Sequence, residues 1–148
     1  MIGPIHHIGI SVEDMDRSIA FWLTFLGANE RSRRIVNAPF LGDLVGYPGI
    51  TLEIAWLDLP DGSSIELVRH AGRAEHPLPQ GTAYPGTVHL CLTVEDLDDA
   101  TGGAIAAGAA VVSVTKVEIP SGPNQGARHV YVRGPDGVTI ELRQPPPG

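Results

Sequence analysis

The sequence repeats itself, and this duplication constrains the fold more than any other feature. The segment HIGISVEDMD at 7–16 returns as HLCLTVEDLD at 89–98, an offset of 82 residues. A second pair follows in the same order, in which PDGSSIEL at 60–67 returns as PDGVTIEL at 135–142, an offset of 75 residues. Two matched pairs indicate two copies of one structural unit. The first copy therefore holds about seven more residues, which we assign to the loop containing NAPFLGDLVGYPG, because insertions cost least in loops.

Each copy is predicted to begin with a strand and a helix. Polar and apolar residues alternate in HIGISV and in HLCLTV, a pattern typical of a strand with one face on the core. Asp14 predicts the cap of a helix that ends at Gly27, and Asp96 opens a weaker, glycine-containing counterpart that ends near Gly108. The apolar face of the first helix is expected to comprise Met15, Ile19, Trp22, Leu23 and Leu26.

Three further strands are expected after each helix, roughly at 30–36, 50–58 and 63–69 and then at 110–118, 127–133 and 138–143. Pro-Asp-Gly turns join the last two strands of each copy as a hairpin. The predicted fold class is α+β, with two β-α-β-β-β modules in tandem that form a cupped mixed sheet around a metal cavity. We expect one domain over 1–148, with module one at about 5–70, a linker at about 71–84 and module two at about 85–143.

The same alternation predicts where four polar side chains point. Glu66 lies between two apolar residues, as does Glu141, so both carboxylates project from the face opposite the core. His7 and His89 follow the same rule. If the helices cover the apolar faces, all four side chains face the cavity. Two neutral imidazoles and two carboxylates cancel the charge of one divalent ion and suit Ni, Co, Mn, Fe or Zn.

The competing interpretation is that these are ordinary surface or core residues, and for any one of them alone it is the better one. It does not explain why His and Glu recur at matching positions among different neighbours. The repeat therefore favours a single metal site made by one His and one Glu from each copy.

Composition excludes several classes of function. The 148 residues suffice for one core, and the net charge of −7 argues against a nucleic-acid or anionic-membrane partner, leaving a small-molecule substrate. Cys91 is the only cysteine, so a thiolate zinc site is excluded and a reducing cytoplasm fits. The chain shows neither a signal segment nor an apolar run long enough to span a membrane.

On these motifs, together with RGPDGVTIEL near the C-terminus, the chain resembles the vicinal oxygen chelate superfamily over residues 5–143. This superfamily includes glyoxalase I, methylmalonyl-CoA epimerase, fosfomycin resistance enzymes, extradiol dioxygenases and bleomycin resistance proteins. The resemblance places the four ligand positions on His7, Glu66, His89 and Glu141, a set similar to that of bacterial-type glyoxalase I, and implies a homodimer. The run GITLEIAWL before Glu66 and the overall length resemble the epimerase instead.

The function implied is a divalent-metal-dependent lyase or isomerase/epimerase. It acts on a hydroxy-thioester or acyl-CoA type of substrate with vicinal oxygens, through a metal-stabilised enediolate. Glu141, or else Glu66, is the candidate base. Glu53 is a weaker candidate, because it alternates away from the cavity. Two alternatives stay open, an Fe(II) extradiol-type dioxygenase and a non-catalytic small-molecule binding protein.

Alignment of the copies also predicts the lining of the pocket. The strands beside the two glutamates place Trp56, His129, Tyr131 and Arg133 on the cavity face, although ordinary strand packing is an equally good account of each. We expect His6 to be structural on the apolar face. The basic cluster Arg31, Arg33 and Arg34 either binds an anionic tail or is a charged strand edge.

Overall fold

The chain forms two compact units, Met1–His76 and Pro77–Gly148, in a computed structural model that describes residues 3–72 and 81–148. Most of the expected linker at 71–84 lies outside the described residues. The first unit contains β1 (Ile8–Ser11), α1 (Met15–Leu26), β2 (Asn29–Val36), α2 (Pro39–Val45), β3 (Thr51–Asp58) and β4 (Ser64–Ala71). The second contains β5 (His89–Thr93), α3 (Leu97–Ala106), β6 (Ala110–Val111), β7 (Val117–Glu118), β8 (Arg128–Arg133) and β9 (Thr139–Gln144).

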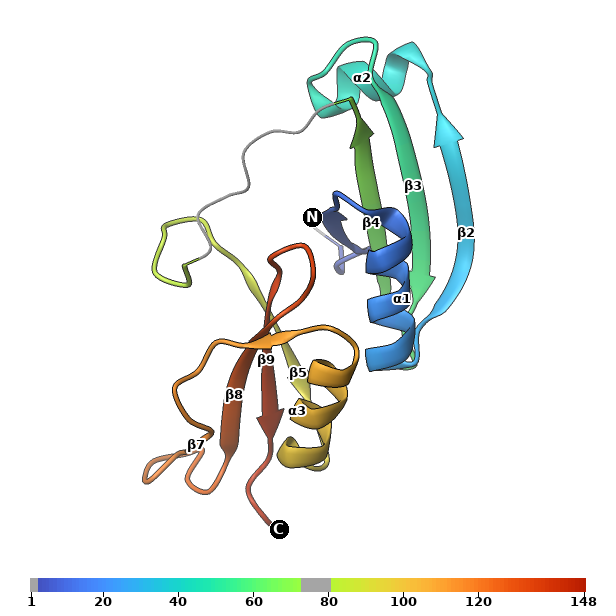
Figure 1. Ribbon diagram of the computed structural model, residues 1–148. Coiled ribbons are helices and arrows are strands. Elements are labelled where there is room, and N and C mark those ends of the chain that lie inside the picture. The colour runs from blue at the N-terminus through green and yellow to red at the C-terminus, as the bar shows by residue number, and fades with distance from the viewer. Residues whose placement is uncertain (1–2, 73–80) are drawn as a thin grey trace. The chain divides into compact units, whose positions relative to one another are not determined.

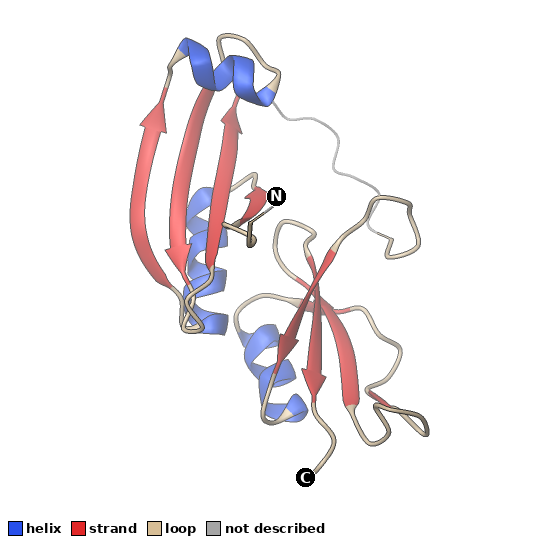
Figure 2. Cartoon of the chain, turned by 180° about the vertical axis from the view of Figure 1, so that it is seen from behind, coloured by secondary structure: helices blue, strands red, loops and turns tan. Residues whose placement is uncertain are grey.

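The two units share one topology, which confirms the predicted α+β fold of two tandem modules. The strand order is β1-β4-β3-β2 in one sheet and β5-β9-β8-β6 in the other, where β7 also pairs with β8. In each sheet the first strand is parallel to the last, and all other neighbours are antiparallel. Each sheet carries its own long helix, α1 or α3 (Figures 1 and 2).

Both long helices begin at the predicted aspartate caps, and α1 ends at the predicted glycine. Asp14 accepts a hydrogen bond from the backbone N–H of Arg17 at 3.0 Å, and Gly27, with φ 63°, ends α1. Asp96 caps α3 in the same way, through the N–H of Asp99 at 2.8 Å. The face of α1 that packs on the sheet is buried at Met15, Ser18, Ile19, Phe21 and Trp22. Leu23 and Leu26, which we expected on this face, are only half-buried.

Strand alternation divides each sheet into a core face and an opposite face. The fully buried residues of the hairpin strands form the core under the helices: Ala55, Leu57, Ile65 and Leu67 in module one, and Val132, Ile140 and Leu142 in module two. Glu66 and Glu141 lie between these residues in sequence and are only half-buried. Their side chains therefore project from the opposite face, as the alternation predicts.

Two parts of the chain differ from the prediction. The extra residues of module one form the helix α2, whose residues Leu41 and Val45 pack against a buried cluster of Ile50, Leu52 and Ile54. In module two the strand expected at 110–118 is split into β6 and β7, both of which pair with β8.

The split in module two has a physical cause at Ser113. Its Oγ accepts a hydrogen bond from the N–H of Tyr131 at 2.8 Å, and the N–H groups of Val112 and Ser113 both donate to the carbonyl of Tyr131. Because two adjacent residues use one position of β8, the ladder is interrupted as in a β-bulge.

Charged side chains tie the first turn of α1 to the strands in module one. Glu53 is buried and accepts hydrogen bonds from Arg33 Nε at 2.8 Å and from Arg69 Nη1 at 3.2 Å. Arg33 also contacts Asp16 at 2.5 Å, and the hydrogen bonds to Asp16 and Glu53 raise the pKa of Arg33. Glu53 therefore has a structural role, which makes it a weaker candidate for the base than Glu141 or Glu66.

Module two repeats this arrangement with different charges. Asp98, the counterpart of Asp16, contacts Lys116 and, at 2.9 Å, Arg128, which occupies the position of Glu53. The hydrogen bonds from Lys116 and Arg128 lower the pKa of Asp98. Both modules therefore anchor the first helical turn to the sheet by ion pairs.

We expect Glu53→Gln to destabilise the protein by about 1–3 kcal/mol in urea unfolding, because Arg69 loses its partner carboxylate and Arg33 keeps only its contact with Asp16. The loss falls below that of a fully buried pair, because both arginines are partly exposed and screened by water. Glu118→Gln, at an exposed position, is the matched control and should change stability by less than about 0.5 kcal/mol. Equal stability of the two variants would contradict the structural role of Glu53.

Candidate metal centre

In module one, the parallel pairing of β1 with β4 brings His7 and Glu66 together. Gly9 of β1 lies opposite Glu66 of β4, and His7 directly precedes β1. The Nε2 atom of His7 is 3.3 Å from Oε2 of Glu66, and both side chains are half-buried. The first and last strands of the module thus bring one predicted His and one predicted Glu into contact.

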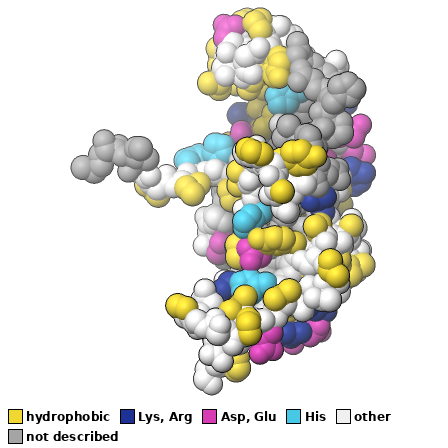
Figure 3. All heavy atoms as spheres, turned by 90° about the vertical axis from the view of Figure 1, so that its left-hand side faces the viewer, with side chains coloured by type: hydrophobic (Ala, Val, Ile, Leu, Met, Phe, Trp, Pro, Cys, Tyr) yellow, Lys and Arg dark blue, Asp and Glu magenta, His cyan; other side chains and the backbone are white. Residues whose placement is uncertain are grey.

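Module two builds the same pair by the same route. Cys91 of β5 lies opposite Glu141 of β9, and His89 is the first residue of β5. Its Nε2 atom is 3.1 Å from Oε2 of Glu141. In the space-filling view, histidine side chains are visible at the surface, some of them directly beside acidic side chains (Figure 3).

The spacing of both pairs fits two adjacent ligands of one metal ion. Ligand atoms bound at about 2.1 Å are about 3.0 Å apart at a right angle and about 3.4 Å apart at the tetrahedral angle. The observed separations of 3.3 and 3.1 Å lie in this range. Among the described residues, no three His, Cys, Asp or Glu side chains form a metal-binding cluster. Each module brings together one His and one Glu of the predicted set.

The surroundings of the pair in module one are aromatic and basic. The Trp56 ring lies opposite Glu66 in the sheet and contacts the His7 ring edge-on at 4.9 Å between centroids. The guanidinium of Arg31 lies over Trp56 at 5.0 Å and pairs with Asp58 at 3.1 Å. Trp56 therefore lies beside His7, and its role in lining a substrate pocket stays a prediction.

His6 differs from the prediction. It is exposed instead of packed on the apolar face, and its Nδ1 lies 2.8 Å from Nδ1 of His7. Residue 6 precedes β1, so the alternation of the strand does not extend to it. Its ring can accordingly support the orientation of the His7 ring.

The surroundings of the pair in module two are more polar. Nδ1 of His129 is 2.7 Å from Oε1 of Glu141, and the Tyr131 ring lies 5.3 Å from the ring of His89. Arg133 is two residues further along β8, and its Nε is buried with no hydrogen-bond partner. Of the residues predicted to line the pocket in this module, His129 and Tyr131 contact the candidate ligands.

Burial and the nearby Glu141 carboxylate act together on two further groups. Partial desolvation raises the pKa of the Cys91 thiol even though the residue is exposed, and the negative charge of Glu141 raises this pKa further. The pKa of Tyr131 is raised for the same reasons. Both groups therefore keep their protons at neutral pH. The sequence reasoning did not assign Cys91 to the site, although its alternation with His89 places both on one face.

The basic cluster after α1 is largely neutralised. Arg33 pairs with Asp16 and Glu53, and Arg31 pairs with Asp58. These contacts favour the charged strand edge over an anion-binding site for these two residues.

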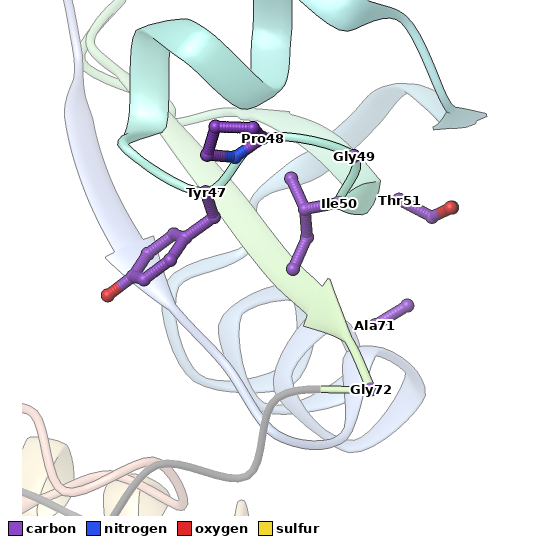
Figure 4. Close-up of a pocket in the computed structure, with 7 residues that line it drawn as sticks. All are labelled: Tyr47, Pro48, Gly49, Ile50, Thr51, Ala71 and Gly72. Atoms are coloured by element: carbon purple, nitrogen blue, oxygen red, sulfur yellow. The ribbon is translucent and has the colours of Figure 1, made fainter.

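Two hollows lie away from the His–Glu pairs. One, of about 450 Å³, lies where β3 begins and β4 ends. It is lined by Tyr47, Pro48, Gly49, Ile50, Thr51, Ala71 and Gly72 (Figure 4). The other, of about 630 Å³, is lined by the ion pairs around Glu53. Neither contains a predicted metal ligand.

Comparison with known proteins decides the family. Residues 6–131 match the Glyoxalase/Bleomycin resistance protein/Dioxygenase superfamily. The chain belongs to this superfamily. The resemblance inferred from the repeated motifs is thereby confirmed.

Two relatives are similar to this superfamily member over nearly the whole of its chain. The chain is 29% identical to a 2-epi-5-epi-valiolone epimerase from Actinomyces sp, over 97% of this chain and 80% of the epimerase. It is 32% identical to a probable lactoylglutathione lyase from Vibrio parahaemolyticus, over 96% of this chain and 91% of the lyase.

Solved structures support the fold. A glyoxalase family protein from Bacillus cereus has a TM-score of 0.82 at 28% identity and covers 99% of this chain and 97% of its own. A fosfomycin resistance protein from Listeria monocytogenes, crystallised with Mn(II), has a TM-score of 0.63 at 20% identity and covers 96% of this chain and 90% of its own, a likeness that shows the fold alone. No described helix of this superfamily member is long and apolar enough to cross a membrane.

We expect native metal-free protein to react with iodoacetamide at Cys91 more slowly than urea-unfolded protein at pH 7.5, because the raised pKa leaves less thiolate. The unfolded thiol titrates at about pH 8.5. The reaction rate of the native thiol should rise only at a higher pH than this. Cys91 is exposed, so access to reagent does not explain a slow reaction. A native thiol that reacts as fast as the unfolded one would contradict this assignment.

Proposed function

We propose that the protein is a divalent-metal-dependent lyase or isomerase/epimerase that acts on a small substrate with vicinal oxygens. The observation that carries the proposal is the recurrence of one His–Glu pair, with separations of 3.3 and 3.1 Å, at matched positions of both modules. The residues His7, Glu66, His89 and Glu141 would hold the ion. We further propose that the chain acts as a homodimer.

The comparisons support this chemistry at a coarse level. One relative is named an epimerase and another a probable lactoylglutathione lyase. The fosfomycin resistance protein of the same fold was crystallised with Mn(II). A mixed set of imidazole and carboxylate ligands suits Mn, Fe, Co, Ni or Zn.

The reaction needs a base and a means to stabilise negative charge. When bound, the ion supplies a Lewis acid that polarises the substrate carbonyl. Glu141 is the first candidate to take the proton from the adjacent C–H, and Glu66 is the second. Cys91 of β5 and Tyr131 of β8 lie opposite Glu141 in the sheet, so both place a protonated side chain beside this carboxylate.

The remaining pocket residues provide a surface for the substrate. Trp56 supplies an apolar wall against His7, and Tyr131 supplies a ring and a hydroxyl beside His89. Arg133 has a buried Nε–H without a partner, which would be satisfied by a substrate oxygen. A hydroxy-thioester or an acyl-CoA is the class of substrate that we propose to test first.

We expect purified protein to bind one divalent ion per chain, and single Ala substitutions of His7, Glu66, His89 or Glu141 to weaken that binding. The reason is that each residue supplies one of the four proposed ligands. Metal content after dialysis and the melting temperature with and without a chelator measure the effect. Glu118→Gln, outside the site, should bind as the wild type does. Protein without metal, with a melting temperature that a chelator leaves unchanged, would favour a non-catalytic binding protein.

We also expect the protein to exchange substrate hydrogen for deuterium from solvent, and Glu141→Gln to slow this exchange by about 10²-fold or more, because the amide cannot act as a base. The panel should include α-hydroxy thioesters, acyl-CoAs and a polyhydroxylated cyclic ketone, and NMR measures the exchange. Metal-loaded protein that exchanges none of them would overturn the proposed lyase or isomerase. Oxygen consumption with a catechol would indicate an Fe(II) dioxygenase instead.

A further inference from the structure

The carboxylate of Glu141 is held at both of its oxygens. Oε2 is 3.1 Å from Nε2 of His89, which is its counterpart in the proposed metal site. Oε1 is 2.7 Å from Nδ1 of His129, on the neighbouring strand β8. One oxygen therefore faces the ligand position, and the other is engaged by a second imidazole.

Among the described residues of module one, no second imidazole contacts Glu66. Alignment of the copies places Ile54 at the position of His129, and Ile54 is a buried core residue that cannot hydrogen-bond. In the part of the chain that the structure describes, Glu66 pairs with His7. Both copies thus contain the His–Glu pair, and within the described part of the chain a second imidazole contacts Glu141 alone.

Hydrogen-bonding chemistry fixes the direction of the contact. An ionised carboxylate only accepts, so Nδ1 of His129 must carry the hydrogen that it shares with Glu141. Nε2 of His129 is buried without a partner. A second hydrogen there would be a buried donor left unsatisfied, which is costly, so the Nδ1–H tautomer is favoured.

We propose that His129 is a positioning residue for the metal centre, which holds Oε1 of Glu141 so that Oε2 stays beside His89 as a single-oxygen ligand. This inference rests on the proposed function, because the metal site belongs to that proposal. A glutamate free to rotate must lose side-chain entropy when it binds an ion. The hydrogen bond from His129 orders the carboxylate beforehand and is strengthened by its negative charge.

The test compares metal affinities of full-length variants, measured by competition between the protein and a chromophoric chelator for Co(II). His129→Leu should bind about 10–100-fold more weakly than the wild type. His129→Asn should recover most of this loss, since its amide N–H group lies close to the position of Nδ1. His129→Gln should not, because its amide group lies nearer to the position of Nε2. The visible spectrum of bound Co(II) should change in His129→Leu and return in His129→Asn, which a merely structural role would not produce.

His70→Leu is the matched control, because His70 is a half-buried strand residue that contacts Tyr47 instead of a proposed ligand. It should bind Co(II) as tightly as the wild type. If His129→Leu also does so, or if the Asn and Gln variants bind equally, the positioning role is wrong while the metal site stands. Wild-type protein that binds no Co(II), Ni(II), Mn(II), Fe(II) or Zn(II) would overturn the proposed metal site and this inference with it.

Discussion

The parallel pairing of the first and last strands of each module is the contact on which the candidate site depends. It joins β1 to β4 and β5 to β9, and so brings the beginning of a module beside its end. A parallel pair cannot be closed by a tight turn, so the chain must cross over through a helix and further strands. The helix that covers the core face is therefore also what permits the His and the Glu to meet on the opposite face.

The duplicated modules keep the ligand pair and vary what surrounds it. In module one the neighbours are an aromatic ring, Trp56, and the exposed imidazole of His6. In module two they are His129, Tyr131 and Cys91, all of which contact the pair or share its face. In module one the additional imidazole contacts the histidine of the pair, whereas in module two it contacts the glutamate. In each module the added contacts thus order one member of the His–Glu pair.

Much of this arrangement follows from sequence periodicity. Alternation in the repeated motifs predicts the face on which Glu66 and Glu141 lie, and the offset between copies predicts their equivalence. Helix α2 and the interruption of the strand at 110–118 were not predicted, because both depend on contacts between residues that are distant in the sequence. The helix α2 forms where Leu41 can pack on a cluster from β3, and the interruption of the strand at 110–118 depends on Ser113 meeting Tyr131. The bond between His129 and Glu141 joins side chains on adjacent strands, and sequence alone does not give their rotamers.

The Pro-Asp-Gly turn has a consequence for how this fold can change. In module one it sets the pairing of β3 with β4, in which Trp56 lies opposite Glu66, with Gly62 at φ 85° in the turn. Because side chains in a strand alternate, deleting one residue here would turn a core leucine toward the site and bury the glutamate under the helix. Length variation is therefore confined to other connections, as the additional residues between β2 and β3 illustrate. The length of this hairpin fixes the face on which Glu66 lies, whereas the connection between β2 and β3 can change in length without altering the register of β3 and β4.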